Sequence, residues 1–161
     1  MVRNRIGKQK IRMKILEFDR VFIEREFTKA ENFLFDARNV YAIKYDNFDV
    51  SSFDKLNSEL LKNVSNNFIV YCLWMGDTPT DLKPKYVGHA KRTISRQRLR
   101  AHLTKKNKAT GAQLDKIKKY LDEKKYIGLT YLIIEPSYMR TSLEELIINK
   151  NIEKLEWNKY K

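Results

Sequence analysis

The apolar run 68–75, with the sequence Phe-Ile-Val-Tyr-Cys-Leu-Trp-Met, limits the fold of this chain more than any other segment. Within it, residues 68–74 are rich in β-branched and aromatic side chains, with Asn66-Asn67 before them and Gly76 after the run, and they are typical of a buried strand. The run is far shorter than the ~20 apolar residues that a helix needs to cross a bilayer. We therefore expect a chain with no membrane partner, organised as a layered unit around this strand.

Two further strands are predicted in the second half of the chain. Residues 85–88 follow a loop with two prolines at 76–84, so they are expected to form a hairpin with the first strand. The run 128–134, Gly-Leu-Thr-Tyr-Leu-Ile-Ile, has the composition of a third strand. The chain from residue 68 onward therefore predicts an α/β (α+β) unit, with a small three-stranded antiparallel sheet flanked by helices.

The helices of this unit are predicted from apolar spacing and from capping residues. A weakly amphipathic helix is expected at 94–104. Thr110 with Gln113, and Ser142 with Glu145, have the spacing of capping boxes that open two more helices. The last helix is expected to turn four apolar residues toward the core: Leu143, Leu146, Ile147 and Leu155.

Residues 1–67 are predicted to be an N-terminal extension of the module at 68–161. Residues 1–20 are a basic arm, 21–37 can be helical, and Ser51 or Ser52 can cap a helix. The apolar face of that helix is predicted to consist of Phe53, Leu56, Leu60, Leu61 and Val64. No linker rich in Pro, Gly or Ser separates the two parts, so we expect one compact body.

The charge of the chain points to a polyanionic partner. It has 33 Lys and Arg against 20 Asp and Glu, a formal net charge of +13. Residues 82–108 contain ten basic residues and no acidic one, and residues 1–20 contain seven basic residues against two acidic ones. Such runs are often only solvated faces, but so many unopposed charges favour a phosphate-binding surface. The lone Cys72 excludes an internal disulfide and fits an intracellular, cytoplasmic location.

Five polar residues follow one another along the chain in an order that suits the hydrolysis of a phosphodiester bond. Tyr71 lies in the first strand, Tyr86 precedes Val87 and Gly88 in the second, and Arg98 precedes His102 by four positions. Glu144 lies at the expected start of the last helix. A carboxylate can hold a divalent cation, and arginine offers a planar fork of donors to phosphate oxygens. A tyrosine near a cation can position or deprotonate water.

In this order and spacing the chain resembles the GIY-YIG nuclease family over residues 68–158. The first motif is reduced to Ile69-Val70-Tyr71, without its glycine, whereas the second is intact in form. The resemblance implies that Tyr71 is the base or water-positioning residue, Tyr86 a polar support and Arg98 a phosphate clamp. It also implies that Glu144 holds one metal ion, Mg²⁺ or alternatively Mn²⁺. His102 would assist proton transfer or bind a tyrosine or phosphate.

The resemblance further implies supporting residues, whereas the candidates for DNA contact come from the basic run at 82–108. Gly88 would allow close backbone approach, and Asn158 lies where many members have a late asparagine. Glu145 is the rival of Glu144 as metal ligand, and His89 is interpreted as a loop or DNA-backbone contact rather than a ligand. The residues expected to contact DNA are basic: Lys85, Lys91, Arg92, Arg96, Arg100, Lys105 and Lys106.

The expected function is a metal-dependent endonuclease acting on duplex DNA. A small module with an N-terminal extension looks like the restriction enzymes of the family, and cutting both strands would call for a homodimer. Two alternatives remain open. One is a structure-selective or repair nuclease of the same family, and the other is a basic nucleic-acid-binding protein without catalytic activity.

Overall fold

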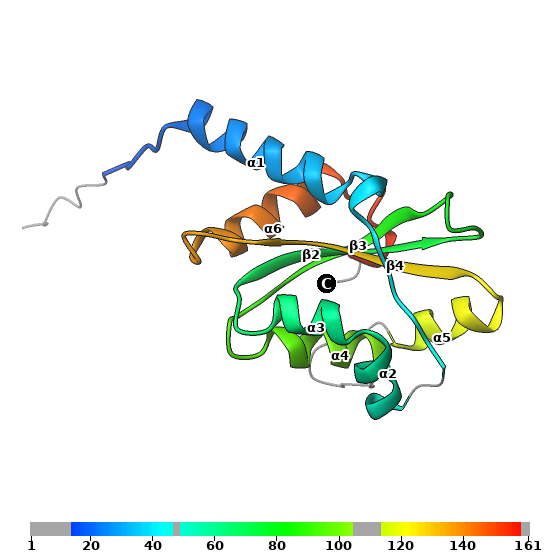
Figure 1. The fold of residues 1–161 in the computed structure, drawn as a ribbon. Coiled ribbons are helices and arrows are strands. Elements are labelled where there is room, and N and C mark those ends of the chain that lie inside the picture. Colours follow the sequence, from blue (N-terminus) through cyan, green and yellow to red (C-terminus); the bar gives the residue numbers. More distant parts are fainter. Residues whose placement is uncertain (1–13, 47–48, 105–113, 159–161) are drawn as a thin grey trace, which may run out of the picture.

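The computed structural model describes residues 14–46, 49–104 and 114–158. Its centre is a four-stranded sheet in the order β1-β4-β2-β3, in which all neighbouring strands are antiparallel (Figure 1). The strands are β1 Tyr41–Ala42, β2 Ile69–Gly76, β3 Lys83–Ala90 and β4 Tyr126–Ile133. The fold is therefore α+β, and the predicted hairpin between the first two strands of the module is confirmed as β2–β3.

Helices cover both faces of the sheet, so that the sheet forms the middle of three layers (Figure 1). Helices α1 and α6 lie on one face, and α2 to α5 lie on the other. Their bounds are α1 Arg20–Leu34, α2 Val50–Leu56, α3 Ser58–Val64, α4 Ser95–Thr104, α5 Leu114–Asp122 and α6 Met139–Lys150. Two 3₁₀ turns complete the described elements, η1 Ala37–Asn39 and η2 Glu156–Asn158.

Strand β2 carries two hydrophobic cores because its side chains alternate between the two faces. Tyr71 and Leu73 pack with the apolar residues of α2 to α5, whereas Val70 and Cys72 pack with those of α1 and α6. Every residue of β2 except Gly76 is buried, which explains why its sequence is a continuous apolar run and not an alternating one. Residues of the N-terminal extension contribute to both cores.

The sheet has one strand more than the sequence predicted. The added strand, β1, has two residues, Tyr41 and Ala42, which pair with Leu129 and Gly128 at the outer edge of β4. So short a segment has no periodicity that marks it as a strand, and only its partner reveals it. The prediction of three strands was therefore wrong by one.

The helix predicted to run from Ser51 or Ser52 to Val64 is divided at Asn57. The Asn57 side chain bonds both the amide and the carbonyl of Lys44, and it also donates to the carbonyl of Phe53. These bonds fix the break between α2 and α3. The carboxylate of Asp49, and neither serine, caps α2, and Leu56 is 36% exposed rather than buried.

The last helix begins earlier than its predicted capping box. Helix α6 starts at Met139 after Tyr138, so Ser142 lies inside it and that prediction was wrong. Leu143 and Ile147 are buried as expected, but Leu146 is partly exposed. Leu155 is buried after the helix has ended. The capping box of Thr110 and Gln113 lies outside the described residues.

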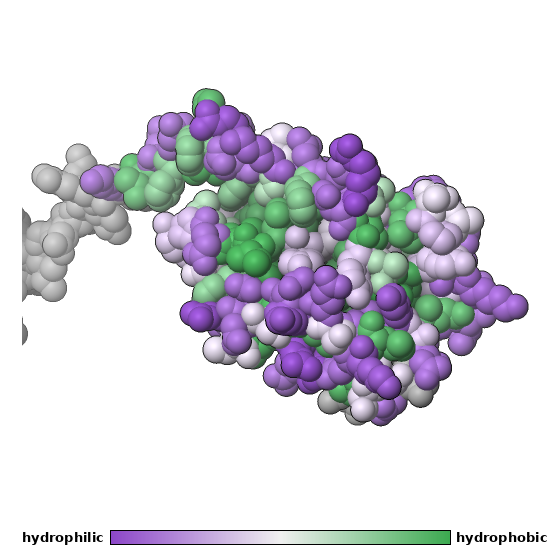
Figure 2. Space-filling model, in the orientation of Figure 1, coloured by the Kyte–Doolittle hydropathy of each residue, from purple (hydrophilic) through white to green (hydrophobic). Residues whose placement is uncertain are grey.

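A hydrophobic groove of about 530 Å³ lies between α1, the end of β4 and the start of α6 (Figure 2). Its apolar lining includes Phe22, Phe27, Phe33, Leu132 and Met139. None of the residues predicted to carry chemistry lines it. Within the described parts of the chain, no helix is long and apolar enough to cross a membrane.

Candidate active site

Two tyrosines and a histidine form a buried cluster on the sheet face covered by α4. Tyr71 comes from the middle of β2, Tyr86 from β3 and His102 from α4. The ring centroids are 6.3 Å apart for the two tyrosines, 6.1 Å for Tyr71 and His102, and 5.3 Å for Tyr86 and His102. All three side chains are almost completely buried. The structure thus brings together three residues that are far apart in sequence.

Gly88 allows the Tyr71 side chain to lie across the edge strand β3. The two residues are register partners in the β2–β3 ladder. A Cβ atom at position 88 would lie 2.7 Å from the Tyr71 hydroxyl oxygen and 2.9 Å from a ring carbon of Tyr86. A larger residue would therefore displace one of the tyrosines, so the glycine allows the close backbone approach expected at this position.

Arg98 lies one helical turn before His102, with its guanidinium beside the Tyr71 hydroxyl. The Tyr71 hydroxyl and the Arg98 Nε atom are both buried, and neither makes a hydrogen bond of standard geometry with the described residues. Burial disfavours the charged guanidinium, but Tyr71, Tyr86 and Glu144 outweigh it and raise the pKa of Arg98. Arg98 therefore stays a cation with unused donor capacity.

Burial makes Tyr71 a poor base in this state. It is the largest effect on the pKa of Tyr71 and raises it well above the usual value; Tyr86 and Glu144 add to the increase, while Arg98 opposes it. A phenol with so high a pKa stays neutral and acts as a hydrogen-bond donor. The environment thus favours the water-positioning role of Tyr71 over the role of base.

Glu144 approaches β3 from the other face of the sheet. It lies on α6, and its Oε2 atom is 3.7 Å from Nδ1 of His89, a residue of β3 and not of a loop as predicted. The His89 and Glu144 side chains are 27% and 13% exposed. The charge of Glu144 raises the pKa of both Tyr71 and Arg98, so the two groups of candidate residues meet around the edge strand β3.

The donor atoms around Glu144 fit a divalent cation that keeps most of its ligands as water or substrate oxygens. A partly buried carboxylate is a suitable anchor for such an ion, and an imidazole nitrogen lies beside it. The described residues contain no group of three or more His, Cys, Asp or Glu side chains that could hold a metal. Glu145, the rival ligand, is exposed on the next position of α6.

Asn158 holds the outer edge of β3 in place. Its side-chain oxygen accepts from the Val87 amide at 2.8 Å, and its side-chain nitrogen donates to the Val87 carbonyl at 2.9 Å. These are the bonds that another strand would make with this edge. Asn158 is buried and belongs to η2, so its contribution is to position β3 next to the candidate site.

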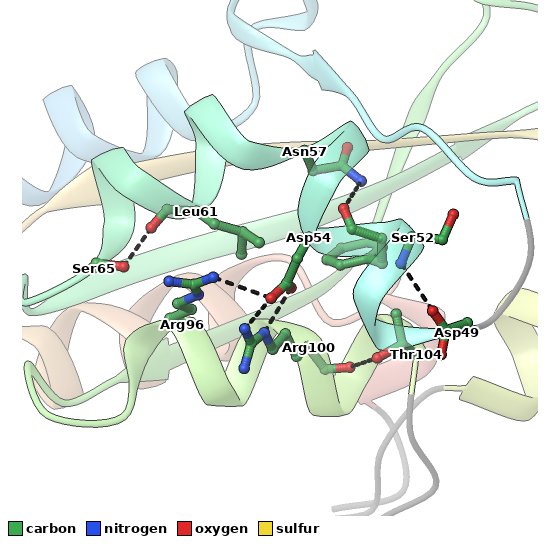
Figure 3. A network of polar contacts seen from close by, with 10 residues as sticks. Asp49, Ser52, Asp54, Asn57, Leu61, Ser65, Arg96, Arg100 and Thr104 are labelled. Atoms are coloured by element: carbon green, nitrogen blue, oxygen red, sulfur yellow. Dashed lines mark hydrogen bonds and ion pairs between the residues drawn. The ribbon is translucent and has the colours of Figure 1, made fainter.

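Several of the basic residues expected to contact DNA are paired with acidic residues from elsewhere in the chain. Asp54 of α2 binds both Arg96 and Arg100 of α4, with Arg96 at 3.0 Å (Figure 3). Lys85 contacts Glu156 at 3.0 Å and is only 16% exposed. The run of basic residues at 82–108 contains no acidic residue, but acidic residues from other parts of the chain neutralise some of its charges in the fold.

Four more basic residues were expected to contact DNA, and the structure describes two of them. Lys91 and Arg92 are exposed in the connection between β3 and α4, and neither has an ion pair with the described residues. Lys105 and Lys106 lie outside those residues. DNA contact stays a prediction for all seven basic residues.

Sequence reasoning missed two partners of the candidate residues. Asp54 is 42 positions before Arg96, and His89 is 55 positions before Glu144. No local motif links residues so far apart, and only the packing of α2 and α6 on opposite faces of the sheet reveals the pairs.

Comparisons of the chain with protein-family models, curated proteins and solved structures give no match. A function can therefore be proposed only from the side chains of the candidate site.

Proposed function

We propose that this protein is a metal-dependent endonuclease that hydrolyses phosphodiester bonds in duplex DNA. One observation carries the proposal: the Tyr71 hydroxyl and Arg98 Nε are buried side by side, without a hydrogen bond of standard geometry to the described residues. Buried polar groups rarely lack a hydrogen-bond partner, which suggests that the Tyr71 hydroxyl and the Arg98 guanidinium bind a substrate. The resemblance to GIY-YIG nucleases supports the same assignment.

Arg98 is suited to bind the non-bridging oxygens of a scissile phosphate. Its guanidinium is half-buried, so a phosphate bound there would interact with it in a medium of lower dielectric constant than water. The negative charge on those oxygens grows during hydrolysis, and a cation fixed in advance stabilises it without reorganisation. A lysine could not replace this planar fork of donors.

Tyr71 is suited to orient the attacking water, because its neutral hydroxyl lies beside Arg98 and thus near the phosphate that Arg98 would bind. His102 packs against both tyrosines and limits the positions that they can take. Glu144 would hold the divalent cation, which when bound polarises the phosphate and lowers the pKa of bound water. Mg²⁺ is the ion implied by the resemblance.

The decisive test is cleavage of plasmid or phage DNA of mixed sequence in the presence of Mg²⁺. We expect discrete fragments from the intact protein, and no cleavage with a chelator or with Glu144→Gln. Glu145→Gln is the matched control, because it removes the neighbouring carboxylate from the exposed side of α6, and it should cut normally. Equal loss of activity in both variants would contradict the assignment of Glu144.

The form of the products separates the proposed enzyme classes. Discrete double-strand fragments, with a protein that is dimeric in solution, would support the restriction-type reading. Metal-dependent nicking of branched or damaged DNA, with intact duplex untouched, would replace it with a repair-type nuclease. Binding without cleavage across Mg²⁺, Mn²⁺ and several substrates would overturn the nuclease and leave a nucleic-acid-binding protein.

A further inference from the structure

His89 and Glu144 place a nitrogen and an oxygen ligand side by side at the proposed metal site. Nδ1 of His89 is 3.7 Å from Oε2 of Glu144. The side chains come from different layers, β3 in the sheet and α6 above it, so the pair depends on the packing of the two elements. The charge of this carboxylate also acts on Tyr71 and Arg98.

The separation of the two atoms is too long for a direct hydrogen bond and approaches the spacing of two ligand atoms on one tetrahedrally coordinated cation. At 3.7 Å the pair exceeds the hydrogen-bond range of about 2.7–3.2 Å. Two metal–ligand bonds of about 2.1 Å at a tetrahedral angle put their ligand atoms about 3.4 Å apart, and an octahedral angle gives about 3.0 Å. The observed separation exceeds the tetrahedral value by about 0.3 Å.

We infer that His89 and Glu144 together chelate one divalent cation, and that the site prefers Mn²⁺ or Co²⁺ to Mg²⁺. The inference rests on the proposed function, in which Glu144 is the metal ligand. Carboxylate and water ligands suit Mg²⁺, whereas an imidazole nitrogen increases affinity for transition metals. His89 is therefore the residue that sets metal preference.

The partly buried position of the pair makes the chelate specific. Limited exposure restricts the rotamers of both side chains, so they lose less conformational freedom when the cation binds. Two protein ligands also leave several positions of the cation free for water and phosphate oxygens, as hydrolysis requires.

The test measures binding of Mn²⁺ and Mg²⁺ to the full-length protein by calorimetry, without DNA. We expect tighter binding of Mn²⁺ than of Mg²⁺ by the intact protein. His89→Ala should weaken Mn²⁺ binding about tenfold or more and change Mg²⁺ binding little, because it removes the ligand that discriminates. Glu144→Gln should lose both ions, whereas Glu145→Gln should bind both normally.

A second substitution keeps the test informative if His89→Ala does not fold. His89→Asp retains a ligand but replaces nitrogen with oxygen, so the preference for Mn²⁺ over Mg²⁺ should fall while binding persists. The protein has only two histidines, so Mn²⁺ should also broaden the NMR signals of the His89 ring through its unpaired electrons. Undisturbed His89 signals at saturating Mn²⁺ would overturn the chelate.

Other outcomes distinguish this inference from the proposed function. Equal losses of Mn²⁺ and Mg²⁺ affinity in His89→Ala would show that His89 only orients Glu144 and would overturn the metal preference. Unchanged affinities in that variant, with cleavage still dependent on Glu144, would overturn the chelate and leave the nuclease standing. Mn²⁺ binding that needs His89 in a protein that never cuts DNA would support the chelate and overturn the nuclease.

Discussion

At the scale of single residues, the ring and the hydroxyl of Tyr71 have different surroundings. Its ring is completely buried in the core that includes Tyr86, yet its hydroxyl makes no standard hydrogen bond with the described residues. The ring therefore contributes packing, whereas the hydroxyl contributes little to stability. Burying a hydroxyl without a hydrogen bond costs free energy of folding. Binding of a substrate explains the position of the Tyr71 hydroxyl better than a contribution to stability does.

Tyr71→Phe should accordingly change activity far more than stability. We expect the free energy of unfolding to change by less than about 1 kcal/mol, because no strong hydrogen bond is lost. Cleavage should fall about 100-fold or more, as is common when a group that handles water or protons is removed. Urea denaturation and single-turnover cleavage measure the two effects.

Tyr131→Phe is the matched control for this substitution, because Tyr131 is the register partner of Tyr71 on β4. It should leave cleavage unchanged. A large loss of stability in Tyr71→Phe, with cleavage reduced only in proportion to the folded fraction, would make the hydroxyl a structural group.

The sequence predicted that some candidate residues come together, but it did not predict their partners. Tyr71, Tyr86 and His102 come together as their motifs implied: the pairing of β2 with β3 brings the tyrosines close, and α4 packs His102 against them. The contacts of Glu144 with His89 depend on how α6 packs against β3, which no local pattern specifies.

At the scale of elements, edge strand β3 is held by side chains rather than by another strand. Val87 turns its amide and carbonyl outward, and Asn158 satisfies both. Without this contact the outer side of β3 would present unpaired backbone groups. Because β3 carries Tyr86, Gly88 and His89, its position sets where these three candidate residues lie.

Asn158→Ala should destabilise β3 selectively. Two hydrogen bonds to a buried amide and carbonyl are lost, so we expect a cost of about 1–3 kcal/mol. Hydrogen exchange at the Val87 amide should accelerate more than at the amides of β4. Asn149→Ala, on the exposed side of α6, should have no such effect. Uniform acceleration across the sheet would contradict a local clamp.

Helix α4 is held to α2 by a pair of arginine contacts with one carboxylate (Figure 3). Burial raises the pKa of Asp54, but its bonds with Arg100 and Arg96 outweigh this effect and lower it below the usual value. A lowered pKa in the folded state means that the charged pair stabilises the fold above the unfolded pKa of about 3.9. That contribution is lost as the pH falls through the lower, folded pKa.

Asp54→Asn should therefore cost stability at neutral pH, and the cost should shrink in acid. We expect about 1–3 kcal/mol near pH 7, from hydrogen bonds to charged groups. The difference from the intact protein should stay constant above about pH 5 and decrease below about pH 4. Asp77→Asn removes a more exposed ion pair with Lys125 and should cost much less. A difference independent of pH would contradict the charged pairing.

The sequence predicted some boundaries of helices and strands correctly and missed others. The hairpin β2–β3 was predicted correctly because an apolar run, a proline-containing loop and a glycine are all local signals. The break at Asn57 and the early start of α6 were missed. The first depends on Lys44, which the fold brings to Asn57, and α6 has no side-chain cap at its start.

At the scale of the whole molecule, the net charge of +13 must be weighed against the spatial pairing of charges. Asp54 and Glu156 come from outside the basic window and partly neutralise Arg96, Arg100 and Lys85. The free positive charge of the described surface in this window is therefore concentrated near Lys91 and Arg92, where β3 leads into α4. This is also the connection between the strand bearing Gly88 and the helix bearing Arg98.

This distribution predicts which substitutions change the salt dependence of DNA binding. Each lysine or arginine that neutralises a phosphate releases counterions and adds about 0.9 to the slope of log affinity against log salt concentration. Replacing both Lys91 and Arg92 with alanine should therefore lower the slope by about 1.8. Arg96→Ala should lower it by less, because its guanidinium is shared with Asp54.

The measurement is fluorescence anisotropy with a duplex of fixed sequence, between about 50 and 200 mM salt. Lys29→Ala on α1 removes one positive charge from the opposite side of the sheet and should leave the slope unchanged. A decrease of about 0.9 for Lys29, the same per charge as for Lys91 and Arg92, would mean that DNA responds only to net charge. A decrease confined to Lys91 and Arg92 would place the phosphates beside the β3–α4 connection, within reach of the guanidinium that the proposed chemistry requires.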